Sequence, residues 1–140
     1  MRRRRWREYQ TESGARPIRD VVDTMTDEEA ADLAEAMKEV LHEGLCAARH
    51  LRGEIFEIRA GGSTRSFRLL FAPEGRHKQV LLALSVFSKT TQRTPVREIE
   101  LAQQRLVNWR SRARTALHEN IVSWPVRDFV GDIASTIRRG

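Results

Sequence analysis

The chain has 140 residues, of which 31% are charged and 6% aromatic, and its formal net charge is +6. This length favours one domain with its own hydrophobic core, while the single cysteine, Cys46, excludes a disulfide framework and a paired-cysteine metal site. Because the chain has no apolar run of roughly 18 residues, and no signal-peptide apolar region follows its arginine-rich start, we expect a soluble cytoplasmic protein without a membrane partner.

The first third of the chain predicts two helices. Residues 1–11 combine a basic tip with a short strand-like segment, and Ser13, Gly14 and Pro17 then mark a turn and a helix start. Apolar residues recur at helical spacing over 18–25. The capping box at 26–29 begins a second helix, which ends at Gly44. We therefore predict a helical hairpin at the N-terminal end of the domain.

From Gly53 onward the apolar residues alternate with polar ones, as in β-strands. Three strands are expected over 54–59, 65–71 and 79–88, with turns at 61–62 and 73–75. Sequential strands with short turns predict an antiparallel meander. The third strand is apolar almost throughout, so it should be central and covered. A last clear helix follows from about Pro95 to Ala113.

Strand alternation places four side chains together. If the apolar residues of the three strands share the face covered by helices, the opposite face carries Arg59, Arg68, Phe87 and Lys89. Arg68 should then carry charge rather than contribute to packing. Two alternatives remain open: the arginines pair with Glu57 and Glu54 across strands, or Phe87 belongs to the core.

The charge is unevenly distributed along the chain. Residues 17–51 contain nine carboxylates and three basic side chains, whereas residues 52–97 contain nine basic side chains and three carboxylates. A basic region of this kind indicates a surface for a polyanion. The alternative is that these charges only keep strand edges solvated.

Common hydrolase and metal-enzyme motifs are missing. There is no Gly-rich phosphate loop, no HExxH and no paired-cysteine spacing, and the four histidines are scattered. We expect Cys46 to be a small core residue rather than a nucleophile, and we expect neither a metal nor a cofactor.

Arginine, lysine and an aromatic ring suit the cleavage of RNA. That reaction requires removal of a proton from a 2′-hydroxyl, neutralisation of charge on the phosphate, and protonation of the leaving 5′-oxygen. Arginine stabilises the phosphate, and a lysine can take the proton if neighbouring arginines lower its pKa. Phe87 is placed to stack on a base.

Four short motifs occur in a fixed order, at residues 51–59, 67–71, 87–89 and 94–102. Their order and spacing resemble the RelE-like toxin superfamily, in particular its phage-derived, HigB-like branch, and the resemblance covers about residues 6–109. Members are small α/β ribonuclease toxins of type II toxin–antitoxin systems that cut messenger RNA, commonly in the ribosomal A site. The resemblance implies a RelE-like α+β fold, in which an N-terminal helical hairpin packs on a curved antiparallel sheet with a C-terminal helix.

The resemblance also implies roles for individual residues. Arg59 and Arg68 become the arginines that bind the phosphate and stabilise the transition state, and Lys89 becomes the basic group at the end of the last strand. We expect four further residues to bind the substrate: Arg52, Arg65, Phe87 and Arg93. The branch usually has two adjacent lysines after the strand, whereas Thr90 follows Lys89 here, and no Tyr or His lies nearby to share acid–base work.

The predicted function is therefore that of a toxin acting as a ribosome-dependent messenger RNA endonuclease, without a metal. The alternative is a noncatalytic nucleic-acid- or ribosome-binding module of the same fold. Expected partners are messenger RNA, the ribosome and a cognate antitoxin, often a helix-turn-helix DNA-binding protein, and oligomers should form only through the antitoxin complex.

We divide the chain into a toxin domain at 1–116 and a C-terminal extension at 117–140. Four apolar residues of the extension fit one stripe of a short amphipathic helix: Phe129, Val130, Ile133 and Ile137. Such a stripe should be covered, either by the protein itself or by the antitoxin. A disordered tail is the alternative.

Overall fold

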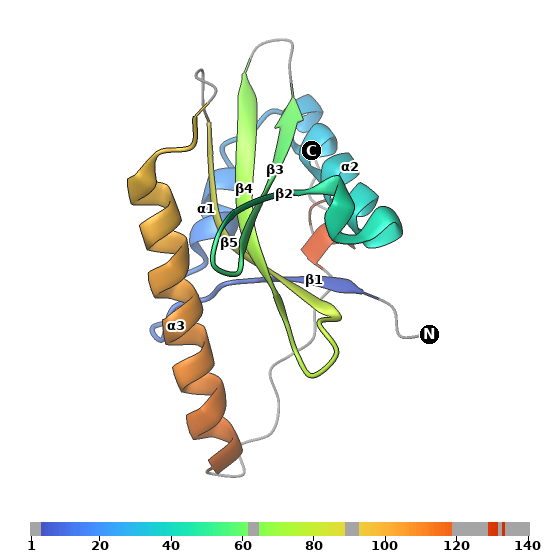
Figure 1. The fold of residues 1–140 in the computed structure, drawn as a ribbon. Helices are drawn as coiled ribbons and strands as arrows, with labels where there is room; N and C mark the ends of the chain where they lie inside the picture. Colours follow the sequence, from blue (N-terminus) through green and yellow to red (C-terminus); the bar gives the residue numbers. More distant parts are fainter. Residues whose placement is uncertain (1–3, 62–64, 89–92, 119–128, 132, 134–140) are drawn as a thin grey trace.

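A five-stranded mixed sheet forms the centre of the structure, and helices pack on both of its faces (Figure 1). The computed structural model describes residues 4–61, 65–88, 93–118, 129–131 and 133. In chain order the elements are β1 (Arg5–Glu8), α1 (Pro17–Val22), α2 (Asp27–Glu43), the 3₁₀-helix η1 (Gly44–Ala47), β2 (Arg49–Arg52), β3 (Ile55–Gly61), β4 (Ser66–Glu74), β5 (Val80–Ser88) and α3 (Val96–His118).

The predicted antiparallel meander is present as β3, β4 and β5, which pair in sequence order. β5 lies between β1 and β4, and every residue from Val80 to Val86 is buried, as expected of a central strand. The predicted turn at residues 73–75 is displaced. Pro73 and Glu74 still belong to β4, where they pair with Leu81 and Val80.

The predicted fold class is wrong at the N-terminal end. The first element is the strand β1, which pairs in parallel with β5, so the sheet is mixed rather than antiparallel. The two helices follow this strand, and they do not form an N-terminal hairpin: α1 packs mainly on β5, and α2 mainly on β3. β1 has one large apolar residue, Trp6, among charged neighbours, so its alternation gave a weak signal.

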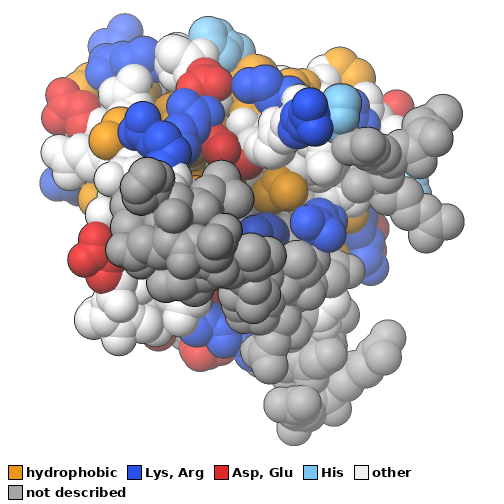
Figure 2. Space-filling model, turned by 90° about the horizontal axis from the view of Figure 1, so that it is seen from below, with side chains coloured by type: hydrophobic (Ala, Val, Ile, Leu, Met, Phe, Trp, Pro, Cys, Tyr) orange, Lys and Arg blue, Asp and Glu red, His pale blue; other side chains and the backbone are white. Residues whose placement is uncertain are grey.

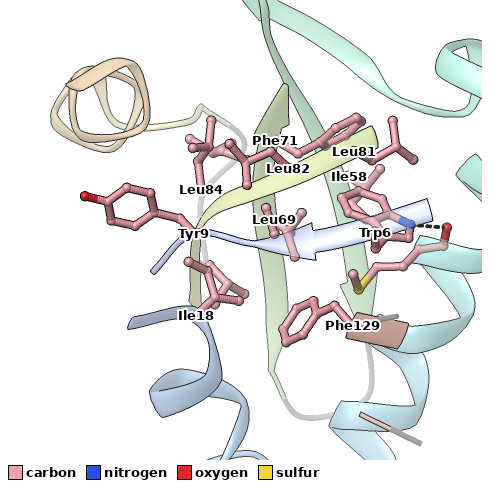
Figure 3. Close-up of a cluster of buried hydrophobic side chains, with 14 of the residues drawn as sticks. Trp6, Tyr9, Ile18, Ile58, Leu69, Phe71, Leu81, Leu82, Leu84 and Phe129 are labelled. Atoms are coloured by element: carbon pink, nitrogen blue, oxygen red, sulfur yellow. Dashed lines mark hydrogen bonds between the residues drawn. The ribbon is translucent and has the colours of Figure 1, made fainter. Parts of the chain in front are cut away.

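Trp6 anchors β1 in the core between the sheet and α2 (Figure 3). Its ring is fully buried, and its Nε1–H donates to the backbone oxygen of Met37 in α2 at 2.9 Å. The same ring meets Phe71 of β4 edge to face, with 4.9 Å between the ring centroids. A buried indole with its N–H satisfied stabilises both neighbours. One residue therefore fixes the parallel strand against a helix and a central strand.

α2 begins with the predicted capping box. The Thr26 hydroxyl accepts from the backbone N–H of Glu29, and the Glu29 carboxylate accepts from the backbone N–H of Thr26. The helix ends before Gly44, whose φ of +83° lies in the left-handed region that favours glycine. Cys46, just beyond it in η1, is exposed, so the prediction that it is a core residue is wrong.

α3 covers the face of the sheet opposite α2 (Figure 1). Its inner face is buried at Ile99, Ala102, Leu106 and Trp109. Arg110 connects the helix to the sheet, because its guanidinium binds Glu54 and Glu74 at 2.6 Å each. Of the helices in the described ranges, none is apolar over a length sufficient to cross a membrane.

Three residues from the C-terminal part of the chain join the same core. Phe129, Val130 and Ile133 are each at most 4% exposed and belong to the cluster that contains Trp6 and Ile18. Phe129 is drawn beside that cluster in Figure 3. Ile137, the fourth residue of the predicted stripe, lies outside the described residues, and the division of the chain at residue 116 stays a prediction.

The ion pair between Glu29 and Arg65 predicts a specific effect of pH. The hydrogen bonds from Arg65 and from the Thr26 backbone lower the pKa of Glu29 to about 2. A carboxylate with a depressed pKa stabilises the fold fully above its unfolded value, about 4.3, and this contribution disappears as pH falls through the folded value. The melting temperature of Glu29→Gln should therefore lie below that of the wild type at pH 6, and the gap should close between about pH 4.5 and 2.

A matched control is Glu35→Gln, since Glu35 is exposed and pairs only loosely with Lys38 at 3.7 Å. Its melting temperature should differ little from that of the wild type at any pH in this window. A gap for Glu29→Gln that is constant from pH 6 to pH 2 would contradict the assignment of the pH dependence to Glu29.

Candidate functional site

Three of the predicted site residues form one row across the sheet. Arg59 of β3 pairs with Arg68 of β4, and Arg68 pairs with Phe87 of β5. Directly opposite residues on neighbouring strands share a face, so the alternation inferred for each strand is confirmed by their pairing. Lys89 lies outside the described residues.

A buried carboxylate lies between the two arginines. The side chain of Glu57 has no exposed surface, and it accepts a hydrogen bond from Arg59 Nε at 2.9 Å. Arg68 Nε lies 3.8 Å from the same carboxylate. Thr94, just before α3, completes the cluster: its hydroxyl donates to Glu57 and accepts from Arg68 Nη1, the latter at 3.1 Å. We call these four residues the Glu57 cluster.

The arginines of this cluster differ in exposure. The side chain of Arg59 is 42% exposed, whereas that of Arg68 is 6% exposed. The expectation that Arg68 carries charge rather than packing is therefore wrong in part, because its guanidinium is enclosed. Burial lowers the pKa of Arg68; the charge of Glu57 opposes this effect, and the charges of Arg59 and Arg49 add to it.

The Glu57 cluster has one negative and two positive side chains, so it keeps a positive charge that faces solvent through Arg59. Because Glu57 is fully enclosed and has three donors around it, it acts as a counter-ion that holds both guanidinium groups in place. The alternative that the arginines pair with Glu57 is therefore confirmed. Glu54, the other carboxylate considered, binds Arg110 and Lys78 instead.

Phe87 is half-buried at the end of the row and packs against the hydrophobic core. The alternative that Phe87 belongs to the core is therefore partly right, and its role in stacking on a base stays a prediction. Two residues earlier on β5, the hydroxyl of Ser85 donates to Glu98 of α3 at 3.0 Å. This contact fixes the start of α3 close to the row.

The other predicted substrate-binding residues are divided between two places. Arg93 lines a groove of about 370 Å³ next to Thr94. Arg65 instead binds Glu29 of α2, at 2.9 and 3.0 Å, and covers the ring of Phe67, so it is not brought to the Glu57 cluster. Arg52 is exposed at the end of β2.

The sequence did not point to Glu57, Thr94 or Arg49 as site residues. Glu57 entered only as a pairing partner, and Thr94 only as the first residue of the motif at 94–102, just before the helix that starts at Val96. Arg49 belongs to β2, a strand of four residues that lacks apolar alternation. The available signal was that Glu57 precedes Arg59 by two residues and therefore lies on the same face of β3.

Basic side chains occur at several places on the face seen from below in Figure 2, with acidic and hydrophobic side chains between them. On this face the net positive charge is therefore dispersed. Within the described ranges, no group of three or more His, Cys, Asp or Glu residues is arranged to hold a metal ion. The row of Arg59, Arg68 and Phe87 differs from this dispersed charge because two arginines lie against one buried carboxylate, Glu57.

Residues 15–107 match the model of a family described as "Phage derived protein Gp49-like". The chain is also 32% identical over 108 residues to proteins named "Probable endoribonuclease HigB1" from two strains of Mycobacterium tuberculosis, CDC 1551 / Oshkosh and ATCC 25618 / H37Rv. Each alignment covers 75% of this chain and 84% of the relative. The resemblance expected from the four short motifs is confirmed.

Proposed function

Since the chain belongs to the phage-derived Gp49-like family, we propose that it is the toxin of a toxin–antitoxin pair and an endoribonuclease that cleaves messenger RNA. One observation supports this most directly: two arginines and an aromatic ring lie in one row across the sheet, and a buried carboxylate holds the two arginines in place. Preorganised guanidinium groups stabilise the charge that develops on a phosphate during transfer. The name of the Mycobacterium relatives points to the same reaction class.

The proposed reaction has one bond forming and one breaking. The 2′-oxygen attacks the neighbouring phosphorus and loses its proton, while the bond from phosphorus to the 5′-oxygen breaks and that oxygen gains a proton. Arg59 and Arg68 stabilise the phosphorane-like charge, and Phe87 stacks on a base. Lys89, which follows β5 in the sequence, is our candidate for the proton transfer.

Glu57 is not proposed as the base. Its carboxylate has no exposed surface and is surrounded by Arg59, Arg68 and Thr94, so a 2′-hydroxyl cannot reach it in this arrangement. A base must lie within hydrogen-bond reach of the proton that it takes. Glu57 is therefore proposed as a positioning residue.

We further infer that the enzyme acts on messenger RNA held by the ribosome in the cytoplasm, that an antitoxin of helix-turn-helix type neutralises it, and that cleavage needs no metal. The reason is the HigB-like resemblance together with the charge of the site, since the proposed steps use only side chains. The alternative, a noncatalytic ribosome-binding module, is favoured by Thr90 in place of a second lysine.

The test compares two arginine variants of equal charge. Arg59→Ala removes an exposed site guanidinium, whereas Arg76→Ala removes an exposed one from the β4–β5 turn. With messenger RNA on ribosomes, we expect the wild type and Arg76→Ala to give fragments with cyclic phosphate and 5′-hydroxyl ends. Arg59→Ala should be on the order of 100-fold slower.

Three outcomes count against parts of this proposal. Growth arrest and ribosome binding without any RNA cleavage would favour the noncatalytic module. Fragments with 5′-phosphate ends would exclude the side-chain mechanism. Equal cleavage of free and ribosome-bound messenger RNA would refute ribosome dependence alone.

A further inference from the structure

A groove of about 370 Å³ opens between β2 and the start of α3. It is lined by Arg49, Leu51, Arg93, Thr94, Val96 and Ile99. Three of these side chains are aliphatic, and they range from Ile99, which is nearly buried, to Val96, which is 52% exposed. The volume falls within the range of small-molecule sites, which are apolar with a few charged groups.

The groove is continuous with the Glu57 cluster through Thr94. This residue lines the groove, and its hydroxyl contacts both Arg68 and Glu57. A chain whose phosphate lies at Arg59 and Arg68 therefore has the groove beside it, and the nucleotide on one side of that phosphate can enter.

The charges of the groove favour an anionic ligand. Among the described residues, no carboxylate pairs with Arg49 or Arg93, whereas Arg59 and Arg68 share Glu57. Guanidinium groups without a protein counter-ion are suited to bind phosphate oxygens. The aliphatic side chains offer a surface for the flat face of a base, which stacks on apolar as well as aromatic groups.

We propose that this groove is a nucleotide subsite, in which Leu51, Val96 and Ile99 hold the base next to the cleaved phosphodiester. Arg49 and Arg93 bind the other phosphate of that nucleotide, the one that is not cleaved. The proposal rests on the proposed RNA substrate and adds the place where a neighbouring base is bound. Base binding here would contribute to the choice of cleavage position, since it fixes the register of the RNA at the arginines.

Two valines of α3 provide a matched pair of variants. Val96 lines the groove, whereas Val107 lies further along the helix, is 66% exposed and lines a different surface hollow. Val96→Glu and Val107→Glu change the net charge equally, so they alter long-range attraction to RNA to a similar extent. Both valines are exposed, so neither change should disturb the core, and equal melting temperatures check this.

The probe is a fluorescein-labelled tetranucleotide with 2′-O-methyl groups, which binds but lacks the attacking hydroxyl. We expect Val96→Glu to weaken its binding by about tenfold or more, a change of about 1.4 kcal/mol, and Val107→Glu by less than about twofold. Removing one base from the tetranucleotide should weaken binding to the wild type. It should have a much smaller effect on Val96→Glu, because that variant has already lost the base contact.

The outcomes separate the subsite from the proposed activity. Equal weakening by Val96→Glu and Val107→Glu would overturn the subsite, because only net charge would then matter. An abasic tetranucleotide that binds as tightly as the intact one would also overturn it. If the expected differences appear and the wild type still cleaves no RNA, the subsite is supported and the endonuclease proposal fails.

Discussion

Arg68→Ala is expected to slow RNA cleavage by on the order of 100-fold or more and to destabilise the protein by about 3 kcal/mol. The rate falls because the positive charge of Arg68, which lies behind the exposed Arg59, no longer stabilises the transition state. The stability falls because Arg68 is 6% exposed and its removal leaves the buried Glu57 with one guanidinium fewer. Arg59 and Thr94 still contact Glu57, so the loss should lie near the lower end of the range for broken buried pairs.

Cleavage should be measured well below the melting temperature, and stability by urea unfolding, so that the two effects are separated. Arg68→Lys is the matched control: it keeps the charge but cannot bind Glu57 and Thr94 with a planar fork, so it should recover part of the stability and little of the rate. Undiminished cleavage by folded Arg68→Ala would remove Arg68 from the proposed site.

The row of Arg59, Arg68 and Phe87 could be predicted because alternation along each strand follows from hydrophobic burial alone. The environment of the row could not. Whether Glu57 binds one arginine, two, or none depends on how α3 approaches the sheet and where it places Thr94. That approach is set by contacts between residues far apart in sequence, which a local pattern does not contain.

The same distinction explains the fold. The long elements have strong periods, so α2, β3 and β5 were predicted with nearly correct bounds, whereas β4 and α3 run past their predicted ends at 71 and 113 to Glu74 and His118. β1 and β2 have four residues each and few apolar side chains, so their pairing is decided by the partner strand. Trp6 is the one residue of β1 whose burial the sequence does indicate. A large apolar side chain among arginines is costly to expose, and here it is fully buried.

The second large effect is expected at Phe129. This ring is 1% exposed and belongs to the central core cluster, so Phe129→Ala should destabilise the isolated protein by about 3–5 kcal/mol. For a chain of this size, such a loss lowers the melting temperature by roughly 10 °C or more. Truncation after Ala116 also removes Val130 and Ile133, so it should lower the melting temperature at least as far.

Val107→Ala is the control for these measurements, because Val107 is 66% exposed and its truncation should change stability by less than about 0.5 kcal/mol. The comparison also decides between the two partners considered for residues 117–140. Docking on the protein's own core predicts a lower melting temperature without any antitoxin, since Phe129 covers apolar surface within the same chain. If Phe129→Ala and the truncated chain melt like the wild type but bind the antitoxin more weakly, the antitoxin is what covers this segment.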